Sequence, residues 1–250
     1  MELIPIARVR NDFPQKFGLP RQAEALSAIP ARVIFEKPFR DANALRGLEG
    51  FDRLWLIWGF DRVGGEGFSP TVRPPLLGGN ARMGVFATRS PNRPNPLGLS
   101  CVRLVRIAWD GPEGPVLHIL GADMTDGTEV YDIKPYLPFA DAFPEAASGF
   151  AGRVKGRRLR VLFSPEHLDR VPPEKRAVLL SALEEDPRPG YRKDAGRAYG
   201  LAYAGLNIRF AVDGDTLTVT GVERPGEDGE KDFSSSSSPS SSPDTDPTKG

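Results

Sequence analysis

The segment of the chain best equipped for chemistry is a proline-rich loop, Arg89–Gly98, which reads Arg-Ser-Pro-Asn-Arg-Pro-Asn-Pro-Leu-Gly. Its three prolines fix their own φ angles and restrict the residues before them. Because the loop is stiff before any ligand arrives, and because arginine forks bind carboxylates or phosphates through two bonds, it suits recognition of an anionic group. A simple connection between strands, with its arginines facing water, fits the composition equally well.

Two neighbouring segments favour the recognition reading. Upstream, residues 72–84 add Arg73, Arg82 and a glycine pair, and downstream Asp126–Tyr136 adds acids and a lysine. Each segment alone is weak evidence, because Asp126 and Gly127 suit a hairpin turn and a surface pair of Asp132 with Lys134 contributes little energy. In isolation, the Pro-Arg-Gln sequence at 20–22 reads as an exposed loop.

The elements that must position these loops are short strands. Segments rich in β-branched and aromatic residues alternate with Gly, Pro and Asp clusters, at Leu3–Arg10, Ala31–Glu36, Phe51–Phe60, Gly84–Thr88, Leu99–Trp109, Pro115–Asp123 and Val130–Ile133. This spacing predicts an antiparallel β-barrel or sandwich. The turn at 110–114 predicts that the fifth and sixth of these segments form a hairpin. A short helix capped by Asp41 is expected through Leu48, and a Rossmann domain is not expected, because no strand–helix alternation ends in a glycine-rich phosphate loop.

A division of the chain is expected near residue 150. We expect the barrel to occupy residues 1–150 and a small α+β domain to occupy residues 151–223. Residues 224–250 form an acidic Ser/Pro-rich tail that we expect to be disordered. In the second domain we predict a basic strand at 155–163 and a helix at 174–185, with Ala177, Leu180 and Leu183 on one face. Strands should follow at 199–203, 206–212 and 216–222, with a type I′ turn at Asp213–Gly214.

Composition limits the remaining possibilities. Residues 222–250 hold seven acids and three bases, which leaves 30 bases and 26 acids, about +4, in the first 221 residues; this permits contact with RNA phosphates without requiring it. A single cysteine, Cys101, excludes an internal disulfide, and with only two histidines beside it the chain has too few soft ligands for a zinc site, so no metal is expected. The longest apolar run, Leu54–Phe60, is too short to span a bilayer, so we expect a cytoplasmic protein with no membrane contact.

Four motifs carry a resemblance to a known family. They are Phe-Gly-Leu-Pro-Arg-Gln at 17–22, Arg-Gly-Leu-Glu-Gly-Phe at 46–51, the run from Leu77 to Pro96, and Asp-Gly-Thr-Glu-Val-Tyr-Asp-Ile-Lys-Pro-Tyr-Leu-Pro-Phe at 126–139. Through them the chain resembles the TrmO (YaeB-like) family of tRNA adenosine N6-methyltransferases, from Leu3 to about Val222. The segment Asp-Pro-Arg-Pro-Gly-Tyr-Arg at 186–192 is similar to the C-terminal signature of the bacterial members.

The resemblance implies a fold and an activity. The fold is a small closed β-barrel that binds S-adenosylmethionine near the interface of a homodimer, unlike the Rossmann-type methyltransferases. The substrate is N6-threonylcarbamoyladenosine at position 37, in the anticodon loop of certain tRNAs, which is methylated on N6.

The resemblance also implies which residues contact the cofactor. Carried over position by position, they are Pro20, Arg21, Gln22, Asp61, Arg62, Arg89, Leu99, Asp126, Gly127 and Thr128. The chain departs from the family pattern in two places: it has Asp61–Arg62 where members often have His-Gln, and Glu129 where a proline is frequent. We expect Arg89 to hold the α-carboxylate of the cofactor.

Alignment of the acceptor nitrogen with the methyl group should dominate catalysis. The N6 nitrogen is part of a urea-like group, so losing its proton helps the transfer; Asp126 or Asp132 are the candidate acceptors, and Asn95 is placed with them at the catalytic centre. For RNA, the candidate phosphate contacts are Arg73, Arg82, Arg93, Arg157 and Arg158, and the candidate stacking residues are Tyr131, Tyr136 and Tyr191.

Two other readings stay open. The first is a noncatalytic RNA- or nucleotide-binding barrel in which the proline loop grips phosphate. The second is a hydrolase that uses Ser90 or Ser100 with His118, although neither serine lies in a nucleophile-elbow pattern. Tight binding of S-adenosylmethionine separates the methyltransferase from both.

Overall fold

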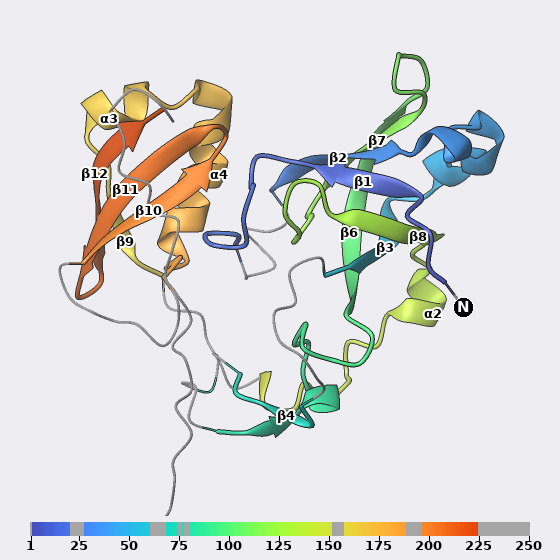
Figure 1. Ribbon diagram of the computed structural model, residues 1–250, viewed down its shortest axis with the longest axis horizontal. Coiled ribbons are helices and arrows are strands. Elements are labelled where there is room, and N and C mark those ends of the chain that lie inside the picture. Colours follow the sequence, from blue (N-terminus) through green and yellow to red (C-terminus); the bar gives the residue numbers. More distant parts are fainter. Residues whose placement is uncertain are drawn as a thin grey trace, which may run out of the picture.

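The computed structural model describes residues 2–20, 28–60, 69–74, 77, 81–151, 158–188 and 197–224. Within these residues, six antiparallel strands form a closed barrel (Figure 1). Around the barrel they follow the order β1 (Ala7–Arg10), β2 (Pro30–Phe35), β7 (Val116–Leu120), β6 (Leu97–Ala108), β3 (Arg53–Gly59) and β8 (Glu129–Pro135). β8 pairs with β1 and so closes the ring. The predicted closed barrel is confirmed.

Period-two alternation fills the barrel interior. In β3 the side chains of Leu54, Leu56 and Trp58 are buried, while the residues between them are only partly covered. β1, β2 and β7 alternate in the same way and add Val9, Val33, Leu117 and Ile119, among others, to one apolar core. The alternation that identified the strands in the sequence therefore also assigns their inner faces.

The predicted hairpin of β6 and β7 is confirmed, and it contains an irregularity. The register shifts between Leu104, which lies opposite Ile119, and Arg106, which lies opposite His118. Val105 is thus the extra residue of a β-bulge, and its side chain is exposed. The bulge reverses the alternation, so that Arg103 and Arg106 are both on the outer face although they are three residues apart.

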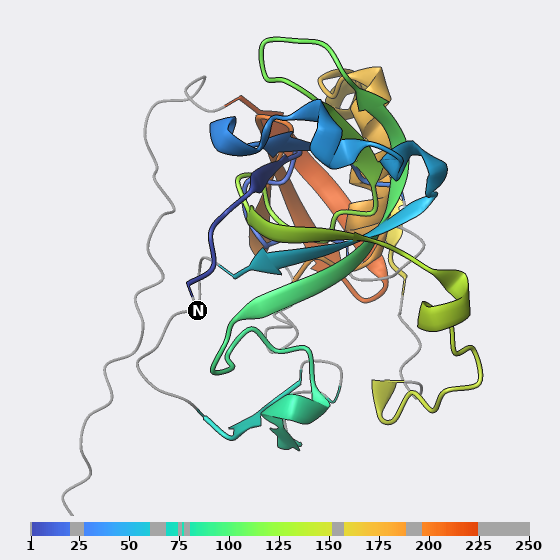
Figure 2. The same cartoon turned by 90° about the vertical axis from the view of Figure 1, so that its right-hand side faces the viewer.

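Short elements connect the barrel strands. The predicted strand at Gly84–Thr88 is wrong: β5 (Met83–Gly84) pairs with β4 (Thr71–Val72), and the residues after it form a 3₁₀ turn, η5 (Val85–Ala87). The predicted Asp41 cap is confirmed, since its carboxylate accepts from the backbone N–H of Asn43 at the start of η2 (Ala42–Leu45). The helix itself is a 3₁₀ turn, flanked by η1 (Lys37–Phe39) and η3 (Leu48–Gly50). Figures 1 and 2 show that the β4–β5 arm projects away from the barrel.

The C-terminal sheet has the order β10 (Ala198–Tyr203), β11 (Leu206–Asp213), β12 (Thr216–Glu223) and β9 (Arg160–Leu162), with β9 parallel to β12. α3 (Pro165–Asp169) and α4 (Pro173–Glu184) accompany it, and a further short helix, α2 (Pro138–Asp141), follows the barrel. The helix predicted at 174–185 is confirmed, but its predicted face is right only at Leu183: α4 buries Val178, Leu179, Ala182 and Leu183, whereas Ala177 is exposed and Leu180 is partly exposed. The buried residues of α4 are spaced by three and four positions, as on the core-facing side of an amphipathic helix, whereas the prediction used a spacing of three alone.

The type I′ turn occurs in a different hairpin from the one predicted. In the turn between β11 and β12, only Gly214 has a positive φ, +54°, whereas a type I′ turn needs two such residues. Between β10 and β11, Ala204 and Gly205 both have positive φ, at +50° and +74°. The backbone N–H of Ala204 also donates to the carbonyl of Asp12, which ties this turn to the barrel side of the molecule.

The described parts of the connection from β1 to β2, residues 11–20 and 28–29, pack on the C-terminal sheet. Phe13 and Ile29 are fully buried in the C-terminal core, and Phe13 contacts the ring of Tyr203 at 4.9 Å between centroids. Gly18 lies so close to Leu201 that a Cβ there would be 2.1 Å from Leu201 Cδ1. The division near residue 150 stays a prediction, because an N-terminal segment contributes to the C-terminal core.

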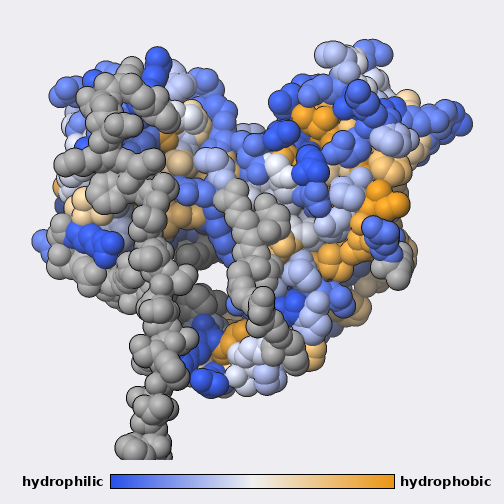
Figure 3. Space-filling view, in the orientation of Figure 1, coloured by the Kyte–Doolittle hydropathy of each residue, from blue (hydrophilic) through white to orange (hydrophobic). Residues whose placement is uncertain are grey.

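The two lobes are separated on one side by a notch, and Figure 3 shows that its visible walls are mostly hydrophilic. In the part of the chain that the structure describes, no helix combines the length and apolar character needed to cross a bilayer.

Candidate functional site

One end of the barrel gathers the segments predicted to bind the cofactor. β1, β3 and β7 end there, and β2, β6 and β8 begin there, because consecutive pairs run antiparallel. The Asp126–Thr128 turn joins β7 to β8 at this end, and the proline loop enters β6 there. Pro20 lies further along the chain from β1, next to Leu19, which packs on the C-terminal core. The predicted residues Arg21, Gln22, Asp61, Arg62 and Arg157 lie outside the described residues.

The turn from Thr125 to Thr128 continues the pairing of β1 with β8. The N–H of Gly127 donates to the carbonyl of Val9 at 2.8 Å, and the N–H of Val9 donates to the carbonyl of Thr128 at 2.9 Å. Gly127 has φ +84°, a conformation that a residue with a Cβ adopts only at a cost. Thr128 is 2% exposed, so its hydroxyl group is directed into the protein. The turn is therefore a fixed part of the barrel.

Asp126 holds the turn to the segment after β1. Its Oδ1 accepts from the backbone N–H of Asn11 at 3.0 Å, and its Oδ2 lies 3.2 Å from Nη1 of Arg10. The backbone N–H of Asp126 donates to the carbonyl of Phe13, and Nδ2 of Asn11 donates to the carbonyl of Met124. Both carboxylate oxygens thus serve to position the turn, and each oxygen has a second lone pair that can accept.

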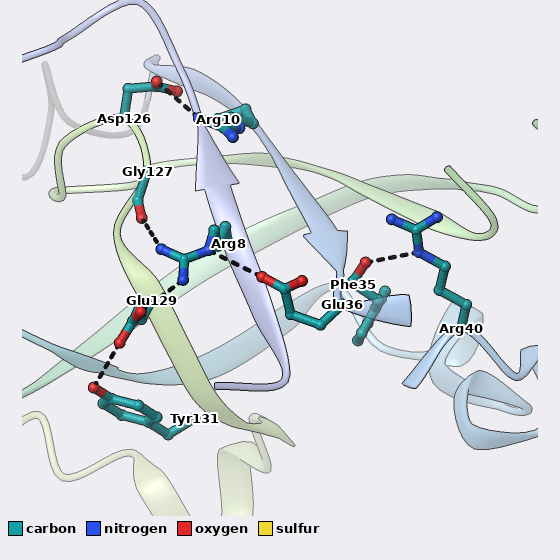
Figure 4. A network of polar contacts seen from close by, with 9 residues as sticks. All are labelled: Arg8, Arg10, Phe35, Glu36, Arg40, Asp126, Gly127, Glu129 and Tyr131. Carbon is teal, nitrogen blue, oxygen red and sulfur yellow. Dashed lines mark hydrogen bonds and ion pairs between the residues drawn. The ribbon is translucent and has the colours of Figure 1, made fainter. Parts of the chain in front are cut away.

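Arg8 fixes the other side of the same turn (Figure 4). Its guanidinium donates to Oε1 of Glu36 at 2.9 Å, to Oε1 of Glu129 at 2.7 Å and to the carbonyl of Gly127 at 3.3 Å. The second oxygen of Glu129 accepts from the hydroxyl of Tyr131 at 3.1 Å. Tyr131 in turn packs over Gly59, where a Cβ would lie 2.6 Å from its hydroxyl oxygen. The network connects the turn to the end of β3.

A polar cluster at this end of the barrel, in which Trp58 and Ser100 are buried, was missed from the sequence. Nε1 of Trp58 donates to Oγ of Ser100 at 2.9 Å, and Ser100 donates to Oδ1 of Asp123. Burial raises the pKa of Asp123, while the hydrogen bond from Ser100 and the charge of Arg89 oppose the rise. Asp123 still meets solvent, so the carboxylate lies at the boundary of the barrel interior. The sequence signal that could have predicted this cluster is Ser100, a polar residue at an inward-facing position of an alternating strand.

Replacing Ser100 with alanine is expected to lower the free energy of unfolding by about 1–3 kcal/mol, because it leaves the buried indole N–H of Trp58 without its acceptor. Urea unfolding monitored by Trp fluorescence measures the loss. Ser69→Ala is the control, because Ser69 is exposed and its hydroxyl donates to the carbonyl of the nearby Thr71 at the start of β4. A Ser100→Ala protein as stable as the control protein would show that the cluster contributes no net stability.

The proline loop has one arginine engaged in holding its own fold. Nη2 of Arg93 donates to the carbonyls of Val85 and Thr88, at 3.1 and 2.7 Å, so Arg93 fixes η5 against the loop. Arg89 is exposed and lies close enough to Asp123 to influence its pKa. Asn95 is exposed, and its carbonyl accepts from the N–H of Leu97 at 2.8 Å. Of these residues, Arg89 is the one that presents a guanidinium to solvent at the barrel end.

Asp132 is not brought together with Asp126. It lies on the outer face of β8, where Oδ2 is 2.8 Å from Nζ of Lys134. It is opposite Ile57 of β3, which is itself opposite Leu99 of β6, so Leu99 and Asp132 belong to one cross-strand row. Leu99 is 54% exposed. The predicted site residues therefore divide between the barrel end and this outer row.

The residues predicted to bind RNA are dispersed. Arg73 and Arg82 are exposed on the projecting β4–β5 arm, and Arg158 is exposed in the C-terminal domain, 3.8 Å from the carboxylate of Glu184. Of the predicted stacking residues, Tyr131 covers Gly59, Tyr136 packs on Trp55 at 5.8 Å between centroids, and Tyr191 lies outside the described residues.

The serine hydrolase reading is wrong in its geometry. Ser100 faces the barrel interior and bonds to Asp123, whereas His118 alternates with the buried Leu117 and Ile119 and so faces outward. The hydroxyl of Ser90 is occupied within its own loop, where it accepts from the N–H of Asn92. Over the described ranges, no three His, Cys, Asp or Glu side chains are grouped to hold a metal ion.

Comparison with known families resolves which barrel this is. The model for the tRNA-methyltransferase O N-terminal domain matches residues 8–142, and the model for the TrmO C-terminal domain matches residues 157–225. The chain belongs to the TrmO family. The predicted resemblance is confirmed, and the two TrmO models fall on the barrel and on the C-terminal sheet.

Individual TrmO-family relatives match over most of their length. The chain is 38% identical over 226 residues to the tRNA (adenine(37)-N6)-methyltransferase of Escherichia coli strain K12, covering 87% of this chain and 96% of that protein. It is 37% identical over 213 residues to a putative S-adenosylmethionine-dependent methyltransferase, RcsF, of Pseudomonas aeruginosa, covering 82% and 90%. A crystal structure of TrmO from Pseudomonas aeruginosa superimposes with a TM-score of 0.69 at 31% identity, covering 90% of this chain and 97% of that one.

Proposed function

We propose that this TrmO-family protein transfers a methyl group from S-adenosylmethionine to N6 of threonylcarbamoyladenosine at position 37 of tRNA. One observation carries the proposal: the Asp126–Thr128 turn, the entry of the proline loop and the end of β3 meet at one end of a closed barrel. These motifs are distant in the sequence, and the closing of the barrel brings them to one location.

The groups at this barrel end fit the cofactor chemically. S-adenosylmethionine carries a carboxylate that a guanidinium such as Arg89 can bind through two bonds. Its adenine needs an apolar surface, which the exposed side chain of Leu99 on the outer row can supply. The carbonyl oxygens of Gly127 and Thr128 already accept one bond each and keep a second lone pair for the adenine amino group. The bound cofactor supplies an activated methyl group on its sulfonium centre.

The protein's own contribution is positioning. Arg8 and Asp126 hold the turn to β1 from two sides, so the loop pays little ordering entropy when a ligand binds. Either Asp126 or Asp132 is proposed as the acceptor of the N6 proton, because each carboxylate retains acceptor capacity beyond its present bonds. Asn95 is proposed to orient the base from the proline loop. Methyl transfer in line with the sulfonium depends on this alignment.

We propose further that two copies associate and that the anticodon loop is the part of the tRNA that binds. Large apolar side chains are exposed on the barrel lobe, with Leu99 at 54%, Phe139 at 86% and Phe143 at 64%. Figure 3 shows apolar residues gathered on the side of the barrel lobe away from the C-terminal domain. Such a surface is typical of an interface between proteins. The single cysteine and the substrate support a cytoplasmic location.

Incubating the purified protein with S-adenosylmethionine and tRNA that carries threonylcarbamoyladenosine is expected to add one methyl group to that nucleoside alone. Nucleoside mass spectrometry measures the gain, and tRNA that lacks the modification is the control. If no methyl is added although the cofactor binds, another acceptor is used. If the cofactor does not bind either, the noncatalytic RNA- or nucleotide-binding barrel becomes the better description.

A further inference from the structure

A row of basic side chains crosses four adjacent barrel strands on the outer face. Arg10 of β1 lies opposite Arg32 of β2, Arg32 lies opposite His118 of β7, and His118 lies opposite Arg106 of β6. We call these four residues the basic ladder. Neighbouring strands are about 4.7–4.9 Å apart, so the ladder extends over about 14 Å.

The β-bulge at Val105 completes the ladder. Without the extra residue, strict alternation from the outward Arg103 would turn Arg106 toward the barrel core. With it, Arg106 returns to the outer face and its Nη2 lies 3.5 Å from Nδ1 of His118. An arginine can only donate, so His118 accepts as a neutral imidazole.

The ladder lines a cavity of about 560 Å³ between the barrel and the C-terminal domain. Lys175 of α4 and Asp12 form an ion pair on the C-terminal side of this cavity. Asp126 also lines it, so the cavity reaches the turn that we propose contacts the cofactor. A ligand bound along the ladder therefore leads to the proposed methyl-transfer site.

The charges along the cavity are not balanced. Its lining holds four permanent cations, Arg10, Arg32, Arg106 and Lys175, and two carboxylates, Asp12 and Asp126. Both carboxylates are engaged, by Lys175 and by Arg10. Arg32 has a long, half-exposed contact with Glu113 at 3.4 Å, and among the described residues no carboxylate pairs with Arg106.

The positive charges of the ladder also affect the pKa of His118. Burial lowers the pKa of His118, and the charges of Arg106 and Arg32 lower it further. Like charges placed directly opposite one another on neighbouring strands destabilise a sheet. A row of this kind therefore carries a cost in stability, which an anionic ligand offsets.

We propose that the basic ladder binds the phosphate backbone of the tRNA substrate and directs the modified adenosine toward the Asp126–Thr128 turn. The inference rests on the proposed function for the identity of the RNA. A polyanion suits the ladder better than a single phosphate, because the cations form a line instead of a pocket around one point. Arg32 and Arg106 make the main phosphate contacts, since Arg10 is already paired with Asp126.

The test uses the full chain and the double variant Arg32→Gln/Arg106→Gln, which removes two charges and keeps two long polar side chains. Binding of tRNA is measured by fluorescence anisotropy over a series of salt concentrations. We expect Kd to rise about tenfold or more at low salt, and the slope of log Kd against log salt to fall by roughly one to two. Arg32→Lys/Arg106→Lys should keep most of the slope, because both charges remain.

Two controls separate this proposal from folding and from the proposed function. Arg46→Gln removes an exposed arginine of the C-cap of η2, outside the cavity, and should leave Kd and the slope unchanged. The double Gln variant should bind S-adenosylmethionine as the parent protein does and should melt at the same or a higher temperature.

If the parent methylates tRNA and the double Gln variant binds tRNA with the parent's Kd and slope, the ladder is not an RNA site. The proposal is then overturned while the proposed function stands. If the parent binds tRNA through the ladder but transfers no methyl, the proposed function fails and the ladder stands.

Discussion

Replacing Asp126 with alanine is expected to weaken binding of S-adenosylmethionine by about 10- to 100-fold, because it removes two hydrogen-bonded anchors of the turn, one of them charged. The N–H of Asn11 and the guanidinium of Arg10 both lose their acceptor. The turn must then be ordered when the ligand binds, and that ordering reduces affinity.

Isothermal titration calorimetry with purified protein measures this effect directly, without tRNA. Asp126→Asn is the graded variant: it keeps an acceptor for Asn11 and loses the ion pair with Arg10, so its affinity should lie between those of the parent and Asp126→Ala. Asp213→Ala is the matched control, because Asp213 is exposed at the end of β11. Unchanged affinity in Asp126→Ala would show that the turn does not contact the cofactor.

Replacing Arg89 with alanine is expected to weaken S-adenosylmethionine binding by about tenfold or more, the value of a charge-assisted bond to a carboxylate. Asp61→Ala is expected to have a smaller effect, because an acid at that position has no favourable role toward the cofactor's carboxylate. Arg89 is exposed at the barrel end and acts on Asp123, whereas Asp61 lies outside the described residues.

Comparing the loss of affinity in Arg89→Ala with that in Asp61→Ala shows which residue makes the main contact with the cofactor. Calorimetry on both variants, with Arg46→Ala as a surface-arginine control, measures both losses. Arg89→Lys should recover part of the affinity, since a lysine keeps the charge but not the two-bond geometry. A larger loss in Asp61→Ala than in Arg89→Ala would reverse the assignment of the main contact.

The Arg8 network gives Glu129 a defined structural role. Its carboxylate accepts from both Arg8 and Tyr131. Because Tyr131 covers Gly59, the network couples the start of β8 to the end of β3. In this chain, side-chain bonds support the turn, in addition to the backbone pairing of β1 with β8.

Much of the fold was determined by the sequence on its own. The alternation of Val102, Leu104 and Ile107 with arginines predicted β6, and the glycine and aspartate clusters predicted where strands end, because period-two burial and turn chemistry are local properties. The family motifs likewise identified the cofactor and the substrate class, since they are long and carried by loops. Local patterns failed at Gly84–Thr88, where a short apolar run formed a 3₁₀ turn, and at α4, where Ala177 and Leu180 were wrongly assigned to the buried face.

Only the tertiary structure decided which residues meet. Ser100 and Asp123, 23 residues apart, bond across the barrel end, and Phe13 enters the core of a domain that begins about 145 residues later. The basic ladder depends on the register of three strand pairs and on a single bulge at Val105, which reverses the outward face for every residue after it. Register is a property of paired strands and not of one strand, so residues as distant as Arg10 and Arg106 become neighbours only when the barrel closes.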